Sequence, residues 1–109
     1  MGYKYFKEKE VIGLKEELVK RLDSAREIAG IPFIITSGLR SPADSIKAGG
    51  FGTDAHTGGF AVDLRCRGSR ERFLIIKGLI MSGFRRIGDE IDHIHADIDP
   101  DKDIDVIWR

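Results

Sequence analysis

Apolar residues recur at steps of three and four between residues 8 and 29, and they form one stripe. They are Val11, Leu14, Leu18, Leu22, Ala25 and Ile28. This spacing predicts an amphipathic helix over residues 8–29. Gly13 disfavours helix, so we expect the helix to start late in this range. Gly30 and Pro32 then stop the helix.

Two later stretches alternate between apolar and polar positions, which is the pattern of a half-buried strand. In residues 60–66, Val62, Leu64 and Cys66 share one face, and Ala61, Asp63 and Arg65 share the other. In residues 91–98, one face carries Ile94, Ala96 and Ile98, and the other carries His93, His95, Asp97 and Asp99. A polar face on a well-formed strand needs solvent or a metal.

The remaining elements follow from short apolar runs and from glycine and proline. Residues 33–37 are apolar and β-branched and predict a buried strand. Ser69 is a suitable N-cap for a helix to about Ser82, and Gly83 is suited to end it. The other expected elements are a short helix at 42–47, a loop at 49–52, a strand at 84–87, a turn at Gly88-Asp89, and a tail at 100–109 that folds back through Val106, Ile107 and Trp108. The buried side of the helix after Ser69 is expected to hold Phe73, Ile76, Leu79 and Ile80.

Helices and strands do not alternate regularly enough along this chain for a wound parallel sheet. We therefore predict an α+β fold, with a small, mostly antiparallel sheet and helices packed on one side. The 109 residues are expected to form one domain, because a chain of this length buries a sufficient core.

Composition excludes several classes of function. The formal net charge is zero, so nothing favours binding to nucleic acid or to an anionic membrane. No apolar run is long enough to span a bilayer, and the N-terminus resembles no secretory signal. We therefore expect cytoplasmic synthesis and a monomer. Cys66 is the only cysteine, which excludes an internal disulfide, and its strand position predicts a small core residue.

The candidate chemistry lies in two histidine segments. His56 stands in a glycine-containing stretch, and Asp63 follows seven residues later inside the strand 60–66. Two imidazoles and a carboxylate are a common ligand set for catalytic zinc. Spacing alone does not decide whether His93 or His95 is the third ligand. The structural alternatives are a loop histidine bonded to backbone and an aspartate paired with Arg40, Arg65 or Arg67.

The acidic C-terminal segment offers a weaker metal motif. The spacing of Asp97, Asp99 and Asp101 is similar to a calcium loop. The EF-hand pattern fails, because Lys102 replaces the required glycine and Trp108 replaces the bidentate glutamate. We therefore interpret the segment as an acidic, solvated loop.

Three segments in this order resemble the zinc D-Ala-D-Ala carboxypeptidase family, which also includes L-Ala–D-Glu endolysins and shares its fold with the hedgehog domain. They are Ser37-Gly38-Leu39-Arg40-Ser41-Pro42, Asp54 to Asp63 with His56 near its start, and Asp92-His93-Ile94-His95-Ala96-Asp97. The resemblance covers nearly the whole chain. Leu39 and Asp54 depart from the family's usual tyrosine and serine, which leaves the bond specificity open.

The resemblance implies roles for individual residues. The zinc ligands would be His56, Asp63 and His95, with Asp92 as catalytic base. Arg40 would bind substrate and polarise the scissile carbonyl, and the substrate site would also include Ser37, Asp54 and His93. On an ideal strand Asp92 faces away from His95, so it reaches the site only if the strand begins after it. Glu90 and Asp97 are the competing acids.

The implied activity is a zinc metallopeptidase that hydrolyses peptide bonds in bacterial peptidoglycan, of D-Ala–D-Ala type, such as a phage endolysin. The alternatives are cleavage of L-Ala–D-Glu and a non-catalytic, zinc-containing wall-binding or virion module. The expected partner is a peptidoglycan peptide and the expected place of action is the cell wall.

Overall fold

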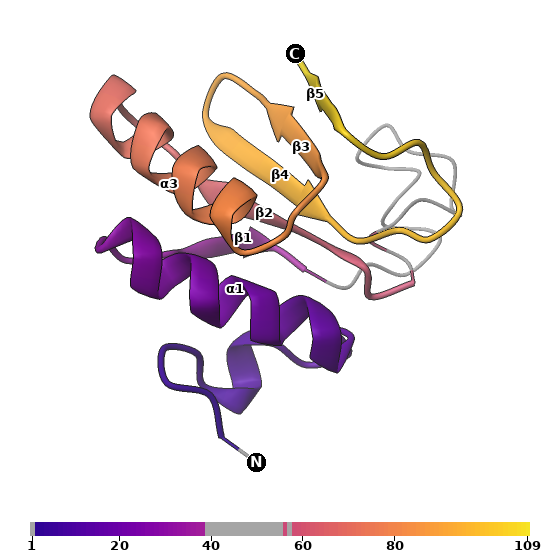
Figure 1. Ribbon diagram of the computed structural model, residues 1–109. Helices are drawn as coiled ribbons and strands as arrows, with labels where there is room; N and C mark the ends of the chain where they lie inside the picture. The colour runs from indigo at the N-terminus through magenta and orange to yellow at the C-terminus, as the bar shows by residue number, and fades with distance from the viewer. Residues whose placement is uncertain (1, 39–55, 57) are drawn as a thin grey trace.

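A computed structural model describes residues 2–38, 56 and 58–109 of the chain. The predicted short helix at 42–47, the loop at 49–52, and the residues Arg40 and Asp54 lie outside the described residues. The elements are η1 (Glu8–Glu10), α1 (Glu16–Ala29), β1 (Ile35–Ser37), β2 (Ala61–Arg65), α3 (Ser69–Met81), β3 (Arg86–Asp89), β4 (His93–Asp97) and β5 (Val106–Trp108). Among the described residues, the helices α1 and α3 lie beside a five-stranded sheet (Figure 1).

The sheet has the strand order β1-β2-β4-β3-β5. The pairs β1–β2, β2–β4 and β3–β4 are antiparallel, and β5 pairs with β3 in parallel. In the centre of the sheet, Asp63 of β2 lies directly opposite His95 of β4. This register decides where the polar residues meet, because directly opposed residues point to the same face.

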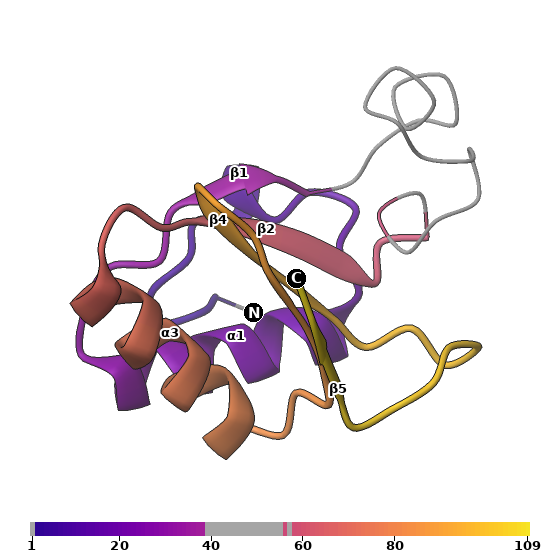
Figure 2. The ribbon, with the colours of Figure 1, turned by 90° about the horizontal axis from the view of Figure 1, so that it is seen from above.

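Both helices cover one face of the sheet, as Figure 2 shows from above. The predicted α+β class, with a mostly antiparallel sheet and helices on one side, is therefore confirmed. The core lies between the layers and includes Leu18, Leu22, Val62, Leu64, Ile75, Leu79, Ile94 and Ala96. Complete burial of one such side chain stabilises the fold by about 2 kcal/mol. In the part of the chain that the structure describes, no helix is both long and apolar enough to cross a membrane.

The first helix is shorter than the apolar stripe predicts. Gly13 has a φ of +77°, which an α-helix does not allow, so α1 begins at Glu16 and only a 3₁₀ turn precedes it. The stripe itself is correct, since Leu18, Leu22 and Ala25 are all fully buried. Gly30 ends α1 in the left-handed conformation, as predicted.

The strand predicted at 33–37 was expected to be buried, which is correct for Phe33 but wrong for the strand as a whole. Among the strands that the structure describes, β1 lies at the edge of the sheet and pairs with β2 alone. Ile34 just before it is 40% exposed, and Thr36 within it is exposed. An apolar, β-branched run therefore marked a strand correctly but did not distinguish an edge strand from a central one.

The second long helix buries a different face from the predicted one. Phe73 and Ile80 are 66% and 51% exposed, whereas Ile75 and Gly78 are buried together with Leu79. The reason is packing: a Cβ at Gly78 would lie 2.5 Å from the carbonyl oxygen of Ala25, so glycine lets α1 approach closely. Ser69 is the first helical residue and not the N-cap, a position that Gly68 takes without a side-chain hydrogen bond.

The predicted turn at Gly88-Asp89 is wrong, because both residues belong to β3 and pair with His95 and Ile94. Gly88 serves close packing, since a Cβ there would lie 2.8 Å from the Trp108 ring. The turn comes at residues 90–92, so β4 begins at His93 and not at residue 91. The tail folds back as predicted, through β5.

Candidate metal centre

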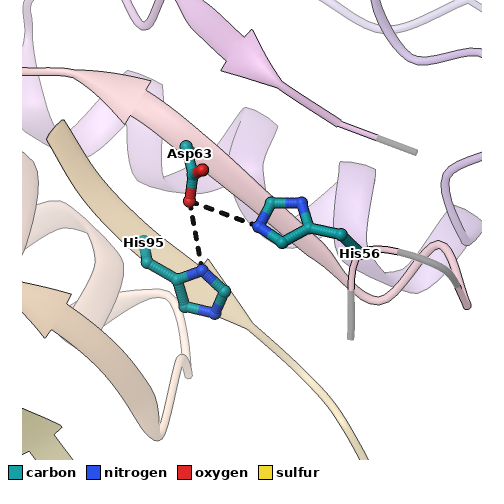
Figure 3. Close-up of side chains that lie close together, drawn as sticks. All are labelled: His56, Asp63 and His95. Atoms are coloured by element: carbon teal, nitrogen blue, oxygen red, sulfur yellow. Dashed lines mark hydrogen bonds and ion pairs between the residues drawn. The ribbon is translucent and has the colours of Figure 1, made fainter. Parts of the chain in front are cut away.

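Three predicted ligands meet on the face of the sheet opposite the helices. Val62 and Leu64 point into the core, so Asp63 between them points away from it. His95 of β4 lies beside Asp63 on the same face, and His56 approaches from the turn before β2 (Figure 3). Their possible ligand atoms all lie within 4.8 Å of one another. Within the described residues this is the one such group of histidine and carboxylate side chains.

His56 is held by backbone groups around it. Its Nδ1–H donates to the carbonyl oxygen of Gly38 at 2.9 Å, because a carbonyl can only accept. Nε2, on the other side of the ring, lies 3.3 Å from Oδ1 of Asp63. The turn depends on Gly59, which has a φ of +77° and lies against the Gly13 backbone, where a Cβ would be 2.4 Å from the carbonyl oxygen.

Asp63 is buried, and a buried carboxylate is costly unless it has partners. Burial by itself raises the pKa of Asp63. Hydrogen bonds and charge interactions with His56 and His95 outweigh burial and hold the pKa well below its usual range. The carboxylate is therefore ionised at neutral pH, which is the form that binds a metal.

His95 lies between two carboxylates. Nδ1 donates to Oδ1 of Asp63 at 3.1 Å, and Nε2 donates to Oδ2 of Asp97 at 2.6 Å. Burial lowers the pKa of His95, but the two hydrogen bonds and the charges of Asp63 and Asp97 outweigh burial and raise it to about 9. The Trp108 ring lies against the imidazole, with centroids 5.3 Å apart.

The donor set fits a divalent cation. Two imidazoles and one carboxylate leave a tetrahedral ion one open position, which is the arrangement of catalytic zinc sites. Both imidazoles also donate their other N–H to an oxygen, Gly38 for His56 and Asp97 for His95. Such outer partners fix the orientation and the tautomer of a ligating histidine.

The structure distinguishes between the two candidate histidines of β4. His93 shares the face of His95 but pairs across the sheet with Arg65, and it is not part of the group around Asp63. Its Nδ1 lies 2.8 Å from Oδ1 of Asp92. The third position in the group therefore belongs to His95.

Asp92 lies just before β4, outside the alternation of the strand, as its predicted role requires. Its side chain is exposed, and its backbone carbonyl accepts from Cys66. The hydrogen bond from His93 lowers the pKa of Asp92. Ser37 pairs with Asp63 across β1 and β2, which brings it beside the group.

Of the competing acids, Asp97 has both oxygens in use. Oδ1 accepts from Arg86 and from the backbone N–H of Asp99, and Oδ2 accepts from His95. The interpretation of this segment as an acidic, solvated loop is confirmed for residues 100–105, which are exposed, but not for Asp97 and Asp99, which are 2% and 9% exposed. Their carboxylates accept backbone N–H groups two residues on, which explains the alternating acids without calcium.

Sequence reasoning missed several contributors to this site. The Gly38 carbonyl gives no signal in a sequence. Asp97 did give a signal in the sequence, because it shares the polar face of its strand with His95. No sequence signal indicated the roles of Trp108 and Arg86, because their contact depends on the parallel pairing of β5 with β3.

Comparison with known proteins shows the fold and the family of the chain. The structure resembles the crystal structure of the L-Ala D-Glu endopeptidase ChiX of Serratia marcescens, with a TM-score of 0.69 and 22% sequence identity over 84% of this chain and 85% of that chain. A search of curated protein sequences finds no match. The model of the family described as Peptidase M15 matches residues 4–97 of this chain. The chain therefore belongs to the peptidase M15 family.

Proposed function

We propose that this chain is a zinc-dependent peptidase that hydrolyses peptide bonds in the stem peptides or cross-links of bacterial peptidoglycan. The observation that carries the proposal is the group of His56, Asp63 and His95 in a chain of the peptidase M15 family. These residues would hold the metal. When bound, zinc would act as a Lewis acid and lower the pKa of a water molecule in its open position toward ~7.

The protein's own residues supply the rest of the chemistry. Asp92, ionised at neutral pH, accepts a proton from the attacking water at its carboxylate and returns one to the leaving amine. Its exposed position allows it to contact a substrate from solvent. Arg40 remains the predicted partner for the oxyanion, and Ser37, Asp54 and His93 remain predicted substrate contacts.

Two bonds are candidates for cleavage. Sequence resemblance suggests D-Ala–D-Ala, and the likeness to ChiX, an L-Ala D-Glu endopeptidase, supports L-Ala–D-Glu as the alternative. These bonds lie at opposite ends of the stem peptide, so their products differ in composition. Action on the wall requires the protein to reach it after synthesis, which remains part of the proposal.

The test is product analysis by mass spectrometry on purified muropeptides that end in D-Ala–D-Ala. Release of terminal D-alanine identifies a carboxypeptidase, and a new D-glutamyl amino terminus identifies an L-Ala–D-Glu endopeptidase. Either activity should disappear with a chelator and return with added zinc. Binding to intact wall without new termini would overturn the proposal in favour of a non-catalytic wall module.

A matched pair of variants separates loss of the metal from loss of the fold. Asp63→Asn removes the charged ligand and should abolish both turnover and zinc retention. Asp89→Asn makes the same chemical change at an aspartate that pairs with Arg72 and lies outside the group, and it should preserve both. Full activity in Asp63→Asn would contradict the assigned site.

A further inference from the structure

The outer nitrogen of His95 is held by a carboxylate that is itself fixed. Asp97 is 2% exposed and lies on β4, two residues after His95 on the same face. Its Oδ2 accepts from Nε2 of His95 at 2.6 Å, and its Oδ1 accepts from Nε of Arg86 at 2.7 Å. The backbone N–H of Asp99 donates to the same Oδ1 at 3.1 Å. The carboxylate therefore cannot rotate without losing several hydrogen bonds.

Arg86 is fixed in turn from two sides. It also donates to the backbone carbonyl of Asp103, and its guanidinium lies 5.1 Å from the centroid of the Trp108 ring. The same ring lies against His95. Trp108 thus packs against both ends of the chain of contacts from Arg86 through Asp97 to His95.

We propose that Asp97 is a positioning residue, which holds His95 with Nε2 protonated so that Nδ1 is presented to the cation beside His56 and Asp63. This inference rests on the proposed function. Nδ1 of His95 points at Asp63 in this structure. A cation bound between them would replace the proton on Nδ1. Nε2–H continues to donate to Asp97, which keeps the imidazole in the binding tautomer.

Asp97→Asn tests the assignment because asparagine has one acceptor oxygen and not two. If that oxygen stays with Arg86 and Asp99, the NH₂ group faces His95 and forces Nε2 to accept. Nδ1 then carries the proton and cannot bind a metal. The variant retains the shape of the side chain, so a change in zinc binding reflects the loss of the carboxylate and not a change in packing.

The assay is competition for zinc with a chromophoric chelator, alongside thermal unfolding of the metal-free proteins. We expect Asp97→Asn to bind zinc about 10- to 100-fold more weakly than wild type. Asp89→Asn, the matched control, also removes an aspartate paired with an arginine, Arg72, but outside the group, and it should stay within a factor of about two. Equal zinc affinity in Asp97→Asn and wild type would overturn the inference, even if the variant is less stable. Failure of wild type itself to bind zinc would instead refute the proposed function.

A second measurement needs no variant. Long-range ¹H–¹⁵N correlation spectra of zinc-loaded wild type report the protonation of each histidine nitrogen. We expect His95 to be bound through Nδ1 and protonated at Nε2. Ligation through Nε2 would overturn the inference, whatever the behaviour of Asp97→Asn.

Discussion

Replacing Gly88 with alanine would place one methyl group between β3 and the C-terminal strand. A Cβ at this position would lie 2.8 Å from both Cε2 and Nε1 of Trp108, and 3.0 Å from Cβ of His95. Carbon atoms in contact prefer separations of about 3.5–4.0 Å. The indole would therefore have to move outward by a substantial part of an ångström.

The energetic cost follows from two opposing effects. Overpacking typically costs about 1–3 kcal/mol. Alanine recovers roughly 0.5–1 kcal/mol, because it restricts the unfolded chain more than glycine does. We expect a net destabilisation of about 1 kcal/mol, which lowers the unfolding midpoint by roughly 4–8 °C for a domain of this size.

Trp108 is the only tryptophan, so intrinsic fluorescence reports directly on the displaced ring. In Gly88→Ala the emission maximum should shift to longer wavelength in the native state, as the indole moves toward water. Gly68→Ala is the matched control, since a Cβ there meets no atom within 4 Å. An unchanged midpoint and an unchanged spectrum in Gly88→Ala would refute the close packing of β5 on β3.

Three further outcomes are expected. Asp92→Asn should retain zinc and stability but lose most turnover on muropeptides, because a proton acceptor is lost without much change in shape; near-normal rates would remove Asp92 as the base. His95→Gln should lose stoichiometric zinc in elemental analysis while His93→Gln keeps it, and the reverse result would exchange their roles. Cys66 is 1% exposed and burial raises the pKa of its thiol. Native protein should therefore react with iodoacetamide on the order of 100-fold more slowly than unfolded protein, and equal rates would contradict its burial.

Strand alternation was the most informative part of the sequence. It put Asp63 and His95 on polar faces of their strands, and the register of β2 with β4 brings those faces together. The choice between His93 and His95 could not come from alternation, because both share one face. It depends on which residue lies opposite Asp63. The register between β2 and β4 decides this, and Asp63 and His95 are 32 residues apart in the chain.

Two features could not be predicted from local sequence patterns because they depend on close packing between elements. Apolar residues fill consecutive positions from Phe73 to Ile76, so several helix faces satisfy the periodicity, and the contact of Gly78 with α1 selects one of them. Gly88 was interpreted as a turn residue because glycine is common in turns. Its actual use is to make room for Trp108, whose position depends on a parallel strand pairing that no local pattern indicates.

The direct opposition of Asp63 and His95 across β2 and β4 has a consequence for folding. A slip of one residue between these strands would turn Asp63 toward the helices and bring Val62 or Leu64 into its place. The misaligned chain would then lack the charged ligand and bind a cation weakly. A ligand at 1,000 times its dissociation constant adds about 4.1 kcal/mol to the state that binds it. Zinc would add that energy only to the correct alignment, so the ion would select the strand register as well as serve the reaction.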